Sequence, residues 1–139
     1  MTPGEAFATL VRLGADESKA VYLRPGADDA AIARMQEAAQ RDLGEPVPEG
    51  YVALLRITNG MQIMNTGFKE ADHLVLENLD VPHPEIIVLG SEGNMAEFVF
   101  DRRDRRFHTI NMGYPDERID SFATFEELLI TVMREQQVL

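Results

Sequence analysis

The spacing of hydrophobic residues changes along the chain, and this change limits the fold classes that the chain can adopt. Before residue 60, apolar residues recur every three or four positions, the period of an amphipathic helix. Between residues 86 and 122 they form a short continuous run and then alternate with polar residues, as in strands. The helical period returns after residue 124. This order predicts an α+β fold whose mostly antiparallel or mixed sheet packs against N-terminal helices and a C-terminal helix.

Residues that favour helix ends bound the helical stretches. Asp28 or Asp29 is suited to cap a first turn, and so is Thr124, with Glu127 three residues later. Gly44 and Gly60 are suited to end a helix in the left-handed conformation. The sequence therefore predicts helices between residues 2 and 14, 28 and 44, 48 and 60, and 124 and 133, together with a short helix within residues 72–80.

The strand signals lie mainly in the second half of the chain. The run of β-branched and aliphatic residues at 86–89 predicts a central strand that is buried on both sides. A hairpin follows, with its turn at residues 102–105, and its second strand runs from 106 to 112. We further expect short strands at 20–23, 61–64 and 118–122, and turns at 65–67, 90–93 and 114–117.

The length of 139 residues favours one domain over residues 1–139 with one core. The sequence contains no cysteine, which excludes disulfides, thiol catalysis and cysteine zinc sites. Neither a basic leader followed by an apolar stretch nor a membrane span is visible, so we expect a cytoplasmic protein.

The charge of the chain is unevenly distributed. The formal net charge is -11, which disfavours binding to nucleic acids and to anionic membranes. Between residues 61 and 100, seven acidic side chains accompany a single lysine. This segment predicts either a solvated acidic surface or a negative surface that attracts a basic protein. The candidate partner-binding residues are Glu70, Asp72, Glu77 and Asp80.

The residues that could carry chemistry do not form a known motif. His73, His83 and His108 lack the spacing of a metal site, and Ser91 lacks the neighbours of a nucleophile elbow or of a phosphate-binding loop. Paired carboxylates lie beside predicted helix starts and turns, where acids are locally favourable. We therefore predict no catalytic residue, no metal and no cofactor.

A second charged feature is the basic run at the predicted hairpin tip, residues 101–106, which alternates aspartate with pairs of arginines. Such a turn is able to bind a phosphate or a partner's carboxylate through bidentate guanidinium contacts. An exposed turn whose charges compensate one another is the simpler interpretation.

A set of short motifs occurs in a fixed order between about residues 28 and 136. Its members are Leu43-Gly44, Pro48, Tyr51, Leu54-Leu55 and Asn59-Gly60, then residues 86–90 and 97–101, and finally Ser121-Phe122 with residues 125–129. Together these motifs resemble the SUKH superfamily of cell-wall-assembly-regulator and immunity proteins, and are most similar to its bacterial YrhA-like branch.

The resemblance implies a single α+β domain that is not an enzyme. It implies a protein-binding module, either an immunity-type protein that neutralises a toxin partner or a regulatory hub related to the cell wall. The acidic segment adds the expectation that a toxin domain bound there is basic. The alternative is a small ligand-binding regulator or enzyme with a pocket between sheet and helices, where His108 or the arginine turn contacts an anion. Neither hypothesis predicts the oligomeric state.

Overall fold

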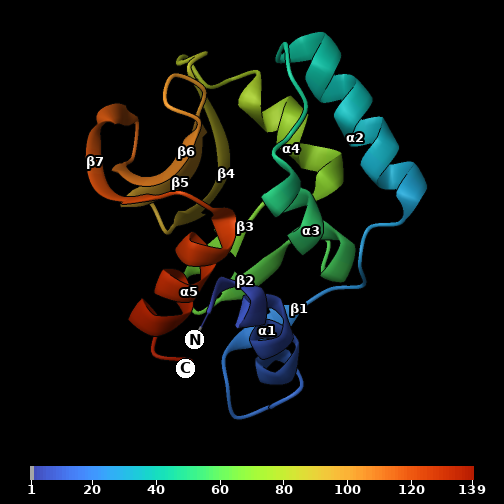
Figure 1. Ribbon diagram of the computed structural model, residues 1–139, viewed down its shortest axis with the longest axis vertical. Helices are drawn as coiled ribbons and strands as arrows, with labels where there is room; N and C mark the ends of the chain where they lie inside the picture. Colours follow the sequence, from blue (N-terminus) through green and yellow to red (C-terminus); the bar gives the residue numbers. More distant parts are fainter. Residues whose placement is uncertain (1) are drawn as a thin grey trace.

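The computed structural model describes residues 2–139 and has the predicted α+β architecture (Figure 1). A 3-10 turn, η1 (Pro3–Glu5), leads into five α-helices: α1 (Ala6–Gly14), α2 (Asp29–Asp42), α3 (Glu49–Ile57), α4 (Ala71–Asn78) and α5 (Phe125–Glu135). Seven strands complete the chain: β1 (Val21–Leu23), β2 (Met61–Ile63), β3 (Thr66–Phe68), β4 (Ile86–Glu92), β5 (Ala96–Asp101), β6 (Arg106–Asn111) and β7 (Tyr114–Phe122).

The seven strands form one sheet in which every neighbouring pair is antiparallel and the spatial order follows the chain order. Strand β4 is therefore central, as its apolar run predicts. Figure 1 shows that β5, β6 and β7 bend strongly around one end of the molecule. A bulge between Val88 and Gly90 in β4, and the register shifts that β7 makes against β6 on either side of Ile110, accompany this curvature.

The helices bury their apolar faces in a main core with one face of the sheet. At its centre Tyr51 of α3 meets Phe125 of α5 edge to face, with the ring centres 5.1 Å apart. Gly50 allows this close approach, because a Cβ at that position would lie 3.0 Å from the Cβ of Phe125. A packing contact thus explains a glycine in the first turn of a helix.

The opposite face of β4, β5 and β6 buries a second, smaller core. Its members are Ile86, Val88, Val99 and Ile110. In β5, Phe98 and Phe100 point into the main core, so the alternate residues Val99 and Asp101 face the other side. The curved strands therefore enclose apolar residues and a carboxylate together.

Most predicted helix ends are confirmed. Asp28 caps α2 by accepting a hydrogen bond from the Ala31 N–H at 2.8 Å, and Thr124 caps α5 by accepting one from the Glu127 N–H at 3.3 Å. Gly44 and Gly60 both have a positive φ after their helices. The predicted short helix within 72–80 is α4.

Three predicted turns are wrong in position. Met64 and Asn65 form the β2–β3 turn, with Met64 at a φ of 54°, so residues 66 and 67 belong to β3. Ser91 lies inside β4, because the positive φ that makes the turn belongs to Gly93. The strand β7 begins at Tyr114, because the left-handed residue is Gly113.

Candidate functional site

All four predicted partner-binding residues lie on or beside α4. Glu70 is the residue before the helix, Asp72 and Glu77 lie within it, and Asp80 follows two residues after its end. Arg24 pairs with Glu70, and the Lys69 Nζ lies 2.7 Å from the Glu77 carboxylate. Asp72 and Asp80 form no ion pair with any residue from 2 to 139. The α4 surface is therefore less negative than its residue count suggests.

Apolar side chains accompany these acids at the surface. Leu74 and Val75 face the core, whereas Leu76 and Leu79 point outward with 67% and 51% of their areas exposed. A groove of about 300 Å³ runs between α4 and α2 beside these leucines. Met35, Ala38 and Val75 contribute to its lining, and Arg34, Arg41, Asp42 and Asp72 are its charged residues. Exposed leucines beside a groove with a charged rim are typical of a protein-binding region.

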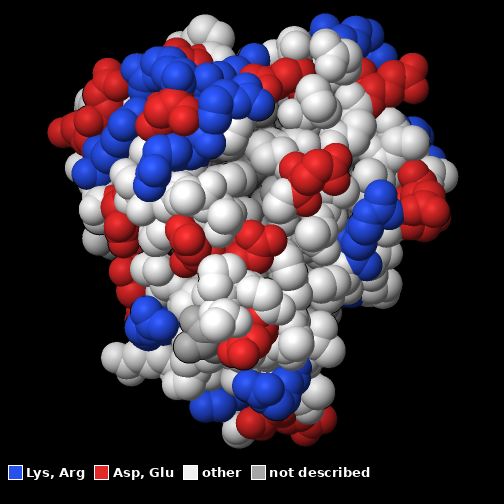
Figure 2. All heavy atoms as spheres, in the orientation of Figure 1, with Lys and Arg blue, Asp and Glu red and all other residues white. Residues whose placement is uncertain are grey.

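The arginine turn forms the basic region at the upper left of Figure 2, over the β5–β6 hairpin of Figure 1. Its charges are extensively compensated. Arg102 and Arg105 reach Glu45 in the α2–α3 loop, at 3.5 and 2.8 Å, and Arg103 pairs with Asp101 and Asp116 at 2.8 and 2.9 Å. Arg102 also donates a hydrogen bond to the Leu43 carbonyl at the end of α2. The turn therefore fixes the hairpin to the α2–α3 loop.

A buried carboxylate anchors the network on the smaller core. Asp101 is completely buried and accepts four N–H donors: the Arg103 backbone, two atoms of the Arg103 guanidinium, and the Arg118 guanidinium. Burial by itself raises the pKa of Asp101, but the hydrogen bonds from Arg103 and Arg118 outweigh burial and hold the pKa at about 2. Asp101 is therefore a structural anion at neutral pH.

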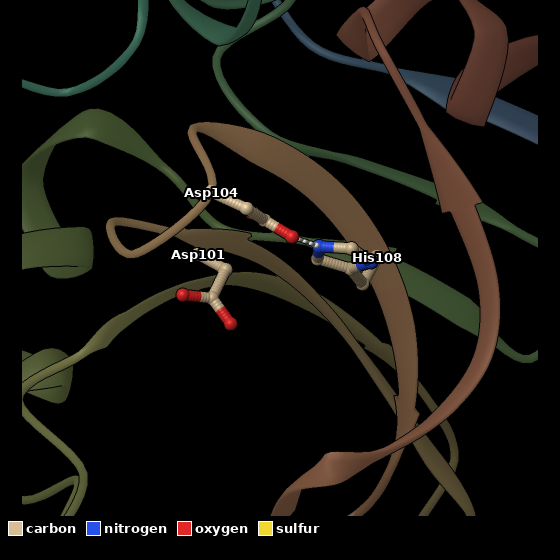
Figure 3. A group of neighbouring side chains, drawn as sticks. All are labelled: Asp101, Asp104 and His108. Atoms are coloured by element: carbon tan, nitrogen blue, oxygen red, sulfur yellow. Dashed lines mark hydrogen bonds and ion pairs between the residues drawn. The ribbon is translucent and has the colours of Figure 1, made fainter.

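His108 lies beside this carboxylate on the next strand (Figure 3). Its side chain is 1% exposed. Its Nε2 lies 2.9 Å from the Asp104 carboxylate, and its Nδ1 lies 2.7 Å from the Ser121 hydroxyl on β7. Arg118 binds the same Asp104 oxygen at 3.2 Å. Three elements thus contribute to one hydrogen-bonded chain: the hairpin turn, β6 and β7.

The atoms of Asp101, Asp104 and His108 lie within 4.8 Å of one another, close enough to suggest a metal site. Arg103 and Arg118 already bind these carboxylates and would repel a cation. The arrangement therefore fits an ion-pair network better than a metal centre.

The other histidines lie elsewhere. His73 is 3.9 Å from Glu70 at the start of α4, and His83 is 3.7 Å from Glu85 in the loop before β4. Sequence reasoning missed the linkage among Asp104, His108 and Ser121, because the strand register that aligns His108 with Ser121 cannot be read from local spacing.

A shallow pocket of about 440 Å³ does lie between the sheet and α5, as the ligand-binding alternative requires. Phe100, Phe107, Phe125 and Arg105 contribute to its lining. His108 alternates with Phe107 along β6 and faces the opposite side of the sheet, so the expectation that His108 contacts a ligand there is wrong.

Among residues 2–139, no helix is both long and apolar enough to span a membrane. Neither the models of known protein families nor the curated proteins give a match to this chain.

Proposed function

We propose that this protein is a non-enzymatic protein-binding module of the SUKH type, acting in the cytoplasm as an immunity protein or a regulatory hub. The observation that carries the proposal is the exposed apolar surface formed by Leu76 on the acidic helix α4 and Leu79 directly after its end. Its proposed occupant is a basic polypeptide segment with an apolar side, of the kind a toxin domain presents.

Charge complementarity supports this occupant. Arg34 and Arg41 offset the two acids of the groove. However, Asp72 and Asp80 flank the two leucines in sequence, and the whole chain carries a net charge of -11. An acidic protein repels a second acidic surface and speeds its encounter with a basic one. Two exposed leucines supply the apolar contact that electrostatic attraction alone does not provide.

The residues that carry the family resemblance support a shared fold. Leu54 and Leu55 are fully buried, and Gly44 and Gly60 have the positive φ of helix ends. Tyr51 donates its hydroxyl to the Lys69 carbonyl at 2.6 Å. These residues occupy core and turn positions. The sequence of α4 can therefore differ between members of the superfamily while the fold stays the same.

The test is capture from an extract of the source cells on the immobilised full chain. We expect a basic polypeptide to bind at low salt and to be released at high salt. The double variant L76A/L79A should no longer capture this polypeptide. The control variant Y22A/I119A should still capture it, because Tyr22 and Ile119 are comparably exposed but lie on other elements. Equal capture by both variants, or no capture by the wild type, would refute the proposal. Dimerisation that depends on Leu76 and Leu79 would instead identify a second copy as the occupant.

The ligand-binding alternative rests on the aromatic pocket beside Arg105. Its cation is offset by Glu49 and Glu126, which line the same pocket, so an anionic ligand has little net attraction there. A thermal-shift screen with phosphates, nucleotides and sugars tests this alternative. A ligand at a hundred times its Kd should stabilise the fold by about 2.7 kcal/mol.

A further inference from the structure

The hydrogen-bonded chain from Asp104 through His108 to Ser121 plays no part in the protein binding proposed above. We propose that Ser121 is an activated nucleophile, which accepts an acyl group from an activated carboxylic ester with His108 as its general base.

The hydrogen-bond directions favour this role. A carboxylate accepts hydrogen bonds and cannot donate them, so the Asp104 contact at 2.9 Å places the hydrogen of a neutral imidazole on Nε2. Nδ1 is then the acceptor, and the Ser121 hydroxyl donates to it at 2.7 Å. A nucleophile that donates to a base, with the base oriented by a third group, is the arrangement that activates serine in acyl transfer.

The reaction requires a buried base and an exposed nucleophile, and His108 and Ser121 differ in this way. The His108 side chain is 1% exposed, and both of its ring nitrogens are engaged, whereas Ser121 is an exposed residue of the edge strand β7. The reaction requires that an electrophile reach the serine oxygen from this exposed side, while the base stays fixed behind it. Arg118 binds the same Asp104 oxygen as His108, at 3.2 Å, and restrains the orienting carboxylate.

The step is a substitution at the carbonyl carbon of the ester. The Ser121 Oγ forms the new C–O bond, the hydroxyl proton moves to the His108 Nδ1, and the bond to the leaving alcohol breaks. His108 returns the proton to that alcohol. The backbone N–H of Ser121 donates to the Asp120 carboxylate at 2.9 Å and is not free to stabilise an oxyanion. We therefore expect slow acylation, only by activated esters, and no rapid turnover.

An alkyl fluorophosphonate probes this reactivity in the folded wild-type protein. It forms a P–O bond to an activated serine and releases fluoride, and tandem mass spectrometry locates the adduct. Ser18 is the internal control, because it is also exposed and its hydroxyl donates at 2.7 Å, but to Asp16 and not to a histidine. We expect labelling at Ser121 in clear excess over Ser18, and loss of that excess in urea.

Three variants then test the roles of Ser121 and its neighbours. H108Q should slow the labelling of Ser121 by about 100-fold or more, and S121A should abolish it. D104N should slow it to a lesser extent, since it removes the group that orients the ring. Comparable labelling of Ser18 and Ser121 in the wild type overturns the proposal, and this result needs no variant to fold. An unchanged rate in folded H108Q overturns it as well.

Discussion

Replacing Asp101 by asparagine removes the charge at the centre of the network on the smaller core. Asp101 is completely buried and accepts four N–H donors from Arg103 and Arg118. Its pKa falls from 3.8 to about 2 in the folded protein, and each unit is worth about 1.4 kcal/mol. Because asparagine stands in for the protonated acid, we expect D101N to lower the free energy of unfolding by about 2 kcal/mol at pH 7.

The pH dependence follows from the direction of this shift. A carboxyl whose pKa is depressed on folding contributes its full stability above the unfolded pKa of 3.8 and loses it as the pH falls toward about 2. The difference between wild type and D101N should therefore be constant from pH 7 to about pH 5 and should shrink below 3.8. Urea unfolding followed by circular dichroism at each pH measures it.

Asp116 offers a matched control, because it pairs with the same Arg103 but is 83% exposed. Since an exposed ion pair contributes little, D116N should cost less than about 0.5 kcal/mol at pH 7. Equal costs for D101N and D116N would refute the assignment of Asp101 as the buried anchor. So would a D101N cost that does not change between pH 5 and pH 3.

Two further substitutions test how the sheet is held. Asn78 forms hydrogen bonds to both the N–H and the carbonyl of Val88, at 2.7 and 2.9 Å. N78A should therefore lower the free energy of unfolding, measured in urea, by about 3 kcal/mol. N94A, at an exposed asparagine, should change it little. A cost for N78A near that of N94A would contradict this role. A Cβ at Gly90 would lie 2.4 Å from the Gly67 carbonyl oxygen. G90A should therefore lower the melting temperature and reduce the free energy of unfolding by about 2 kcal/mol. G4A should be nearly neutral, because a Cβ at Gly4 has open space around it. A neutral G90A would show that β3 and β4 separate without cost.

The elements of the fold were predictable because their signals are local. The cap at Asp28 acts on an N–H three residues later, and so does the cap at Thr124. Residues 72–80 are apolar without a clear alternation, which favoured the short helix α4, and the continuous apolar run at 86–89 was enough to predict that β4 is central. The turns were less predictable, since Met64 adopts a positive φ that its side chain does not favour.

The groups that define the candidate site come from distant parts of the chain. Glu45 lies 60 residues from its partner Arg105, and His108 lies 13 residues from Ser121. No local pattern marks these contacts. Charge counting did locate the acidic segment around α4, but it did not reveal that Lys69 and Arg24 pair with two of its members.

A bulge in the β6–β7 pairing explains why strand alternation alone could not reveal the polar network. His108 pairs with Ser121 and Thr109 with Asp120, so regular pairing would place Ile119 opposite Ile110 on the smaller core. The register instead shifts, and Ile110 lies opposite Arg118. This shift leaves Ile119 58% exposed and brings the Arg118 guanidinium within 2.9 Å of the Asp101 carboxylate. One extra residue in the edge strand thus exchanges an apolar contact for the ion pair that completes the network.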